Sequence, residues 1–390
     1  MIVLLYLVIL LIFIELLLFT FVKVLQSKIP WIITNKDEYP IFNKNKVKNF
    51  FNKTYDPILG WNWKPNTKHQ EKINSKYNNI FFGNLGERKS TYSKKNKYNF
   101  ASFGDSFVFC RFVKNNETWQ SYLNKLTKSN GFNFGVGNFG LDQIYLKYSI
   151  TKMPKNIKTV FIGFVPETLS RCLCSWKHYH EFNNIYAFKP KFNINNKKLI
   201  LMKNPIKEIS SFNKIINLIN KLKQKEFFYK EKFLRYKLSF PYFYSFFKNT
   251  NYNLKLIIFS FLKIFYINQN KIYDFIINEN CKKNDFYFTK KNYENLIFQL
   301  IAEIKKISKI KKHKIVILIF PQKYDLKIKN KYYQKFFSKI KNKFNVIDFT
   351  EVFEKEDPDK LYLPGRYGGH LTAYGNKIVA KTLVKKGLFK

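Results

Sequence analysis

Ser106 and His370 are residue types that nucleophilic acyl chemistry requires, and Ser106 stands at a predicted turn. The apolar run 98–103, YNFASF, leads directly into Gly104, Asp105 and Ser106, and more apolar residues follow. This pattern predicts a strand, a tight turn and a helix that begins at Ser106. Backbone N–H groups and the helix dipole at such a position favour developing negative charge. Ser106 is therefore a candidate nucleophile, although the tripeptide alone is better explained as a helix cap.

A glycine-rich segment supplies groups that would stabilise an oxyanion. Residues 133–140, NFGVGNFG, follow a second predicted strand and precede a helical pattern at 141–150. Glycines allow backbone amides to approach a substrate oxygen. Because open α/β sheets place ligands at the carboxyl ends of neighbouring strands, we expect Ser106 and the turn at Gly137 and Asn138 to converge. Amides of this turn are candidate oxyanion donors.

His370 lies on a loop near the C-terminal end of the chain. Gly368 and Gly369 precede it, and a helical pattern follows it. A neutral imidazole takes a hydroxyl proton near neutral pH and returns it to a leaving group, which is the role that activates a serine. The alternative is a loop histidine that caps the last helix.

The elements around these residues alternate between strand and helix patterns. The predicted strands are 98–103, 132–136, 158–164, 314–320 and 344–349, and the predicted helices include 141–150, 293–310 and 332–342. KIVILIF at 314–320 is apolar throughout, as expected for a strand buried on both faces of a parallel sheet. The alternation predicts the α/β class, with an open parallel sheet and helices on both faces.

Several segments fall outside this alternation. We expect a linker at 25–54, a domain at 55–390, a hairpin at about 188–202 and a helical insertion at about 206–284. Within the insertion, residues 254–267 are apolar but too short to span a bilayer and contain lysines. A buried or interfacial helix is favoured there over a second span.

The N-terminal segment 1–24 is predicted to be a transmembrane anchor. Its residues 2–22 are apolar except for Glu15 and Thr20, and the run is long enough to cross a hydrocarbon core. A cleaved signal peptide is the alternative, but no basic region precedes the run and no small-residue cleavage site follows it. An ionised Glu15 is costly in lipid, which indicates protonation or pairing with another helix.

The chain carries a formal net charge of +44, almost all of it from lysine. The lysines are spread along the whole sequence, whereas nucleic-acid-binding proteins more often concentrate charge and use arginine forks. We therefore predict no nucleic-acid partner. The four cysteines form no CxxC pair and no regular framework, so a disulfide scaffold is not expected.

Cys172, Cys174, His178 and His180 form a rival constellation, since thiols and imidazoles bind zinc. Their spacing matches no recognised structural zinc site, so simple packing on a helix is preferred. We predict neither a metal nor a cofactor.

Three motifs together resemble the SGNH/GDSL hydrolase family. FGDSF, NFGVGNFGLDQ and GGHLTAYGN occur in the order of the family's blocks I, II and V. The similarity extends over about 55–388 when the flanks DPILGW, GER, ETW and FKPKF are included. The resemblance implies a three-layer, flavodoxin-like α/β/α sandwich, Ser106 as nucleophile and His370 as base. It also implies the amides of Ser106 and Asn138 as oxyanion donors, with Asp105 and Gly137 in support.

Two positions depart from the family pattern. The family's acid usually lies three residues before the histidine, where this chain has Tyr367. Asp357 or Asp359 is one substitute, and a main-chain carbonyl that orients the ring and leaves a Ser-His dyad is the other. The usual Asn-Asp pair of block III is also missing, since the chain reads GFVPE at 163–167.

The sequence thus favours a membrane-anchored serine ester hydrolase or O-acyltransferase. By analogy with anchored members of the family, its substrate is an acyl ester, with acetyl esters of a glycan as the specific hypothesis, and its body is extracytoplasmic. Lys23, Lys28 and Lys36 follow the apolar run 2–22, and the positive-inside rule alone predicts the opposite side. The alternative function is a catalytically inactive binding or assembly module in cell-envelope polysaccharide metabolism.

Overall fold

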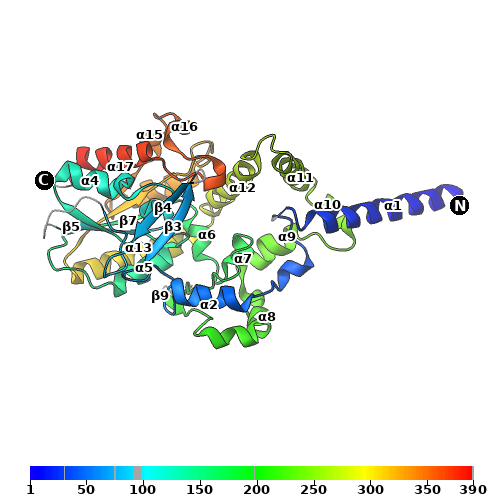
Figure 1. Cartoon of the computed structure of the whole chain (residues 1–390), viewed down its shortest axis with the longest axis horizontal. Helices are drawn as coiled ribbons and strands as arrows, with labels where there is room; N and C mark the ends of the chain where they lie inside the picture. The colour runs from blue at the N-terminus through cyan, green and yellow to red at the C-terminus, as the bar shows by residue number, and fades with distance from the viewer. Residues whose placement is uncertain (30, 74–75, 91–97, 197, 389–390) are drawn as a thin grey trace.

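The centre of the molecule is a five-stranded parallel sheet, shown in a computed structural model that describes residues 1–29, 31–73, 76–90, 98–196 and 198–388 (Figure 1). Its strands lie in the spatial order β11-β10-β7-β5-β6, and all neighbouring pairs are parallel. The strands are β5 (Tyr98–Gly104), β6 (Asn130–Asn133), β7 (Thr159–Phe164), β10 (Lys314–Ile319) and β11 (Val346–Asp348). Counted along the chain, this order is 2-1-3-4-5, which is the flavodoxin-like order.

Helices cover both faces of this sheet. One face packs against α5 (Leu141–Ile150), α13 (Lys291–Ile310) and α14 (Tyr332–Ile340). The other packs against α3 (Ser106–Phe109), α4 (Trp119–Thr127) and α17 (Ala373–Lys385). Every residue of β7 is buried, because side chains on both faces of a central parallel strand are covered by helices. The predicted α/β class and three-layer arrangement are confirmed.

The second strand begins and ends earlier than predicted. Regular pairing in β6 stops at Asn133, whereas the expected strand ran from 132 to 136. The chain nevertheless continues alongside β5, because the N–H groups of Phe134 and Val136 donate to the carbonyls of Ser102 and Gly104 at 2.8 and 2.9 Å. The glycine-rich loop is thus tied to the end of β5.

Small antiparallel pairs flank the sheet. They are β1 (Tyr55–Asp56) with β2 (Gly60–Trp61), β3 (Lys68–Ile73) with β4 (Lys76–Phe81), and β8 (Lys191–Asn195) with β9 (Lys198–Met202). Short helical elements fill the connections, namely η2 (Asn115–Glu117), α6 (Thr168–Cys172), α7 (Lys177–His180), α15 (Thr350–Phe353), α16 (Pro358–Leu361) and η5 (Gly365–Tyr367).

Residues 209–287 are mostly helical. The elements are η3 (Ile209–Lys214), α8 (Ile215–Lys225), the π-helical turn η4 (Tyr229–Phe233), α9 (Leu234–Tyr236), α10 (Tyr242–Phe247), α11 (Thr250–Ile264) and α12 (Lys271–Tyr287). Figure 1 shows these helices on the side of the molecule from which the N-terminal helix projects.

The N-terminal helix α1 (Ile2–Leu25) is long and apolar enough to cross a membrane. Most of it projects from the body, but its last turns are packed (Figure 1). Val22 and Leu25 are buried in an apolar cluster with residues of α11 and α12. The segment 25–54 that follows, expected as a linker, contains η1 (Asn35–Glu38) and α2 (Lys44–Lys53) and buries Ile29 and Ile32.

Candidate active site

Asp105 joins the ends of the two strands at which the strand order reverses, β5 and β7. Open α/β sheets bind ligands at such a switch point. The Asp105 carboxylate is fully buried, and its Oδ1 accepts from the Phe107 N–H at 2.9 Å while its Oδ2 accepts from the Val165 N–H at 2.9 Å. Asp105 therefore caps α3 and holds the loop after β7 in place.

Ser106 is the first residue of α3 and is buried. Its N–H group lies at the start of a helix, where no carbonyl four residues earlier is available. Asn138 follows β6 in the left-handed conformation, with φ of 65°. Within the described ranges, neither the Ser106 N–H nor the Asn138 N–H donates to another protein group. Both groups are thus available to an oxyanion.

The two available N–H groups stand at equivalent places in their loops. The Val136 N–H donates to the Gly104 carbonyl at 2.9 Å, and Ser106 and Asn138 each lie two residues further along. The close approach of the loops depends on glycine, because a Cβ atom at Gly135 would meet the Phe109 backbone nitrogen at 2.2 Å. The loop after β5 and the loop after β6 therefore stay aligned beyond the ends of these two strands.

His370 is oriented by a main-chain carbonyl. Its Nδ1 lies 2.5 Å from the carbonyl oxygen of Tyr367. A carbonyl oxygen only accepts, so Nδ1 carries the proton and Nε2 of the neutral ring is left as an acceptor. This tautomer is the one that a general base for serine requires.

The His370 loop packs beside the start of α3. The His370 ring centroid lies 5.2 Å from that of Phe107, the neighbour of Ser106, and 5.5 Å from that of Phe112. Within the described part of the chain, the Ser106 hydroxyl makes no hydrogen bond to His370. The two segments are therefore adjacent, and aromatic packing makes the contact between them.

The surroundings keep His370 neutral. Desolvation lowers the pKa of His370 to about 3, and the positive charges of Arg111 and Arg171 act in the same direction, against the hydrogen bond to Tyr367. The ring is therefore unprotonated at neutral pH, as a base must be before it accepts a proton.

Arg171 is a buried cation that connects three loops of the site. Its guanidinium lies 3.3 Å from the Asp105 carboxylate and 2.8 Å from the Glu167 carboxylate, and it also donates to the Phe139 carbonyl at 3.3 Å. Desolvation raises the pKa of Asp105, and Arg171 opposes that rise. Arg171 thus compensates the buried carboxylates behind the candidate nucleophile.

Two other charged contacts fix the loop after α3. Glu71 of β3 accepts from Arg111 Nε at 3.0 Å and from the Phe112 N–H at 2.7 Å. Arg88 is buried and donates to the carbonyls of Phe109, Cys110 and Val113. Glu71 and Arg88 therefore hold in place the loop that carries Arg111 and Phe112.

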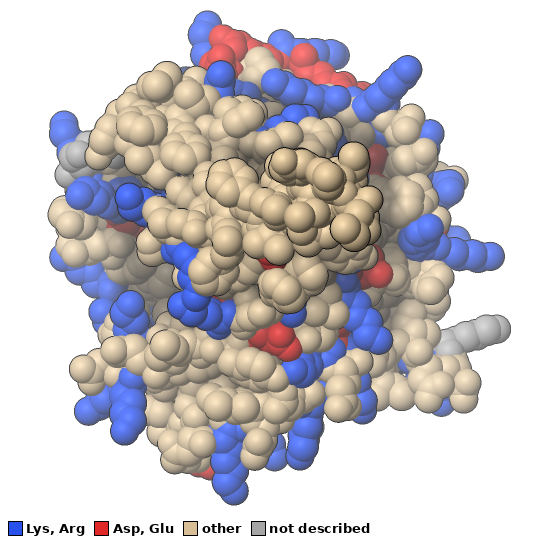
Figure 2. All heavy atoms as spheres, turned by 90° about the vertical axis from the view of Figure 1, so that its right-hand side faces the viewer, with Lys and Arg blue, Asp and Glu red and all other residues tan. Residues whose placement is uncertain are grey.

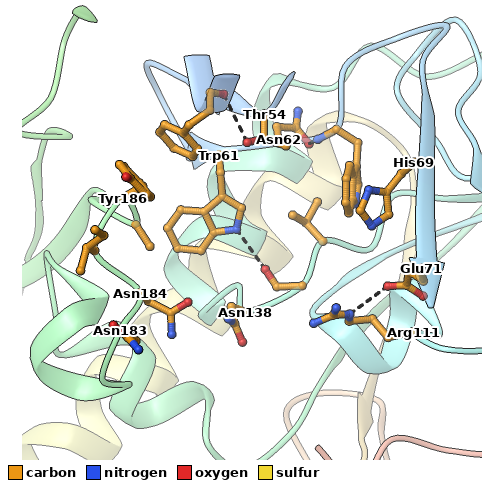
Figure 3. Close-up of a pocket in the computed structure, with 16 residues that line it drawn as sticks. Thr54, Trp61, Asn62, His69, Glu71, Arg111, Asn138, Asn183, Asn184 and Tyr186 are labelled. Carbon is orange, nitrogen blue, oxygen red and sulfur yellow. Dashed lines mark hydrogen bonds and ion pairs between the residues drawn. The ribbon is translucent and has the colours of Figure 1, made fainter. Parts of the chain in front are cut away.

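A cavity of about 340 Å³ opens beside the glycine-rich loop. Figure 3 shows Trp61 between Tyr186 on one side and the Glu71–Arg111 ion pair on the other. The Trp61 indole N–H donates to the Gly137 carbonyl at 3.0 Å, so the cavity wall is attached to the loop that carries Asn138. The other lining residues include Phe50, Thr54, Asn62, Trp63, His69, Asn183 and Asn184. Its lining combines aromatic faces with side-chain amides, which suits a ligand that has both apolar and hydroxyl groups.

The alternative carboxylates for His370 are used elsewhere. Asp357 caps α16 by accepting from the Asp359 N–H at 2.9 Å, and Asp359 pairs with Lys323 at 2.7 Å. Among the described residues, the partner of His370 Nδ1 is the carbonyl oxygen of Tyr367. The main-chain carbonyl is thus the orienting group that the structure shows.

The cysteine and histidine residues considered as zinc ligands have other partners. His178 Nε2 bonds to the Asp37 carbonyl at 2.7 Å, and Cys172 and Cys174 are buried in different apolar clusters. Glu167, His180 and Glu181 do approach one another, but Arg171 and Lys177 form ion pairs with these carboxylates. These residues form an ion-pair network within the described part of the chain.

Sequence reasoning missed the roles of Arg171, Glu71 and Trp61. Arg171 belongs to none of the motifs, and Trp61 appears only as the last residue of the flank DPILGW. Arginine is uncommon in this lysine-rich chain, and three of its five arginines, Arg88, Arg111 and Arg171, surround the site. The scarcity of arginine is therefore the feature of the sequence that could have pointed to these residues.

Comparisons with known proteins place the chain only distantly. No family model matches it, and no curated protein matches it. Among solved structures, one similar chain is described as a "putative lipolytic protein of G-D-S-L family" from Desulfitobacterium hafniense DCB-2. The identity is 9% and the TM-score 0.35, with 74% of this chain and 99% of the other covered. Likeness at this level carries no argument about function, which must rest on the site itself.

Proposed function

We propose that the protein is a membrane-anchored serine ester hydrolase or O-acyltransferase. Ser106 attacks the ester carbonyl, His370 Nε2 takes the hydroxyl proton, and the N–H groups of Ser106 and Asn138 stabilise the oxyanion. His370 then returns the proton to the leaving alkoxide, and water or an acceptor hydroxyl releases the acyl group. One observation carries this proposal. The neutral His370 ring packs on Phe107, the residue next to Ser106, and its Nδ1 carries the proton, which leaves Nε2 free to act as the base.

The first experiment is labelling with a fluorophosphonate probe, which reacts with activated serines. The full-length protein is treated with the probe, and the modified residue is located by peptide mass spectrometry. We expect modification of Ser106, and loss of labelling in Ser106→Ala and His370→Ala. Ser149→Ala, which changes a serine on α5 whose hydroxyl bonds to the Leu146 carbonyl, is the matched control and should label normally. A wild-type protein that is folded and unlabelled would rule out the mechanism.

We propose that the acyl group is carried by a glycan and that the cavity beside Trp61 holds the sugar. Aromatic rings offer flat apolar surfaces, and the amides of Asn62 and Asn184 offer donors and acceptors for hydroxyl groups. The cavity includes Gly137 and Asn138 in its wall, so a bound sugar would lie next to the proposed oxyanion donors.

This substrate class is tested by comparing two probes. Acetate release from O-acetylated xylo-oligosaccharides is measured beside hydrolysis of 4-nitrophenyl acetate. Tyr186→Ala should raise KM for the oligosaccharide and leave hydrolysis of 4-nitrophenyl acetate unchanged, because Tyr186 lines the cavity on the side away from Arg111 (Figure 3). Tyr77→Ala, on exposed β4, is the control. Equal effects on both probes would reject the sugar site while leaving the esterase proposal in place.

A second candidate function is a binding or assembly module that has lost catalysis. It is favoured by the finding that, within the described residues, Ser106 and His370 share no hydrogen bond and no carboxylate contacts the histidine. Binding of the same oligosaccharides without fluorophosphonate labelling would support this function.

We propose that α1 is retained as an anchor in the mature protein. A cleaved signal peptide would not contribute to the folded body, yet Leu18, Phe21, Val22 and Leu25 pack in one apolar cluster with residues of the helical region. The detection of peptides from residues 18–25 in the purified membrane-bound protein is expected. Accessibility of a cysteine introduced at Tyr77 in intact cells would determine the side, which we propose is extracytoplasmic.

A further inference from the structure

We infer that α10 is embedded in the same lipid leaflet that α1 enters, so that the body contacts the bilayer at a second place. The inference rests on the proposed anchoring by α1. The apolar surface concerned is made by Phe240, Phe243, Tyr244 and Phe247, and we call it the α10 surface.

Glu15 provides the contact that places α10 along α1. Its two carboxylate oxygens accept from the N–H groups of Tyr242 and Phe243 at 2.5 and 2.7 Å. The Phe19 and Tyr242 rings also pack, with centroids 5.7 Å apart. The start of α10 is therefore beside residues 15–19 of α1, a helix that continues to Leu25.

The length of α1 allows us to calculate how deep in the bilayer the contact between Glu15 and α10 lies. At 1.5 Å per residue, the 24 residues of α1 extend about 36 Å, and Glu15 lies about 20 Å from Ile2. A hydrocarbon core of about 30 Å that begins near Ile2 ends near residue 22, so Glu15 and the start of α10 lie about 10 Å inside it. If the hydrocarbon core ended at Glu15 instead, only the part of α1 from Ile2 to Glu15 would lie inside it, and about 20 Å of helix is too short to cross the core.

The chemistry of α10 suits that depth. An N–H group in hydrocarbon must find a partner within the protein, and Glu15 supplies partners for the first two N–H groups of the helix while Pro241 has none to satisfy. Phenylalanine and tyrosine dominate the segment, and tyrosine is typical of membrane interfaces. The carboxylate in the apolar segment is thereby explained, since it binds the N-terminal end of α10.

The exposure of the α10 surface points to lipid as its occupant. Phe240 is 75% exposed and Tyr244 is 65% exposed. Other residues of the same segment, such as Phe246, pack in the apolar cluster that includes the end of α1. The surface is continuous with α1, whose side chains are exposed along most of its length. Figure 2 looks onto this end of the molecule and shows uncharged residues around α1, with lysine and arginine side chains dispersed outside them.

The test uses the full-length protein in phosphatidylcholine vesicles that contain acyl-chain nitroxide lipids. A polarity-sensitive fluorophore is attached to cysteines introduced by Tyr244→Cys in α10, Leu10→Cys in α1 and Tyr77→Cys in β4. The four native cysteines are buried, so the unmodified protein serves as the labelling control. We expect the fluorophores on α10 and α1 to be quenched at least about twofold more than the one on β4, because nitroxides act only where lipid is in contact.

The outcomes separate the two proposals. Absence of quenching at Leu10→Cys would reject the anchor itself. Quenching at Leu10→Cys without quenching at Tyr244→Cys would overturn the α10 inference alone. A Tyr244→Cys label that is shielded from both lipid nitroxide and aqueous iodide would also overturn it, because a protein partner or a second copy would then cover the surface. Glu15→Leu should reduce quenching at Tyr244→Cys at least about twofold, since α10 loses its partner, and Leu16→Ala is the matched control.

Discussion

The Nδ1 atom of His370 bonds to the main-chain carbonyl of Tyr367, the residue at the position where the resemblance noted in the sequence predicts an acid. A backbone carbonyl, three residues before the histidine, makes the contact that an acidic side chain would make under that resemblance. A carbonyl fixes the tautomer and the ring orientation, but it carries no full charge to stabilise an imidazolium. In the proposed mechanism, the group that orients His370 is therefore neutral.

Tyr367→Phe should leave the rate of fluorophosphonate labelling within about twofold of wild type, because the orienting bond is made by the main chain and not by the side chain. The variant keeps the ring that packs 5.2 Å from Phe112. His370→Ala, which removes the base, serves as the comparison and should abolish labelling. A large loss in Tyr367→Phe would show that the phenol takes part.

The labelling rate should be flat from about pH 5 to pH 7, because the active form of His370 is the neutral one and its pKa is lowered to about 3. The acid side of the profile should fall only near that value. A midpoint near the ordinary histidine pKa would contradict the environment described for the ring.

Arg111→Gln should move the acid side of the same profile to higher pH, since Arg111 is one of the two cations that lower the pKa of His370. Arg111→Lys keeps the charge and is the matched control. The measurement is the pH dependence of Ser106 labelling in each variant, and an unshifted profile in Arg111→Gln would show that desolvation alone sets the pKa.

Arg171→Leu should lower the free energy of unfolding by about 3–5 kcal/mol, because it leaves the buried carboxylates of Asp105 and Glu167 without their cation. Chemical denaturation in detergent measures the change. The control is Lys306→Met, which breaks an exposed pair with Glu303 and should cost less than about 1 kcal/mol. Similar costs for both variants would mean that Arg171 is not the compensating group.

Asn138→Val should destabilise the glycine-rich loop by about 1–2 kcal/mol, because a β-branched residue is strained at a φ of 65°. Its labelling rate should fall with the displaced N–H group. Asn138→Gly adopts the same conformation without strain and keeps the N–H, so it should label within about threefold of wild type. Loss of labelling in the glycine variant would assign the function to the Asn138 side chain instead.

Sequence alone determined the α/β class and most of the strands and helices of the central sheet. The predicted strand at 314–320 is β10 (Lys314–Ile319), whose residues 316–319 are buried, and α5 has the predicted bounds of 141 and 150, because apolar periodicity reflects which faces are covered. The ends of strands were predicted less accurately. Regular pairing in β6 stops at Asn133, and beyond it the glycine-rich loop makes the hydrogen bonds to β5.

Only the tertiary structure decided which distant groups are partners. Arg171 meets Asp105, Glu71 meets Arg111, and Glu15 meets the start of α10, across separations that no local pattern encodes. Local sequence reports burial and backbone conformation at each position, whereas partner choice for a buried charge depends on how loops from separate strands converge. The orienting carbonyl of Tyr367 belongs to the same category, because every residue has a carbonyl and only the fold selects one.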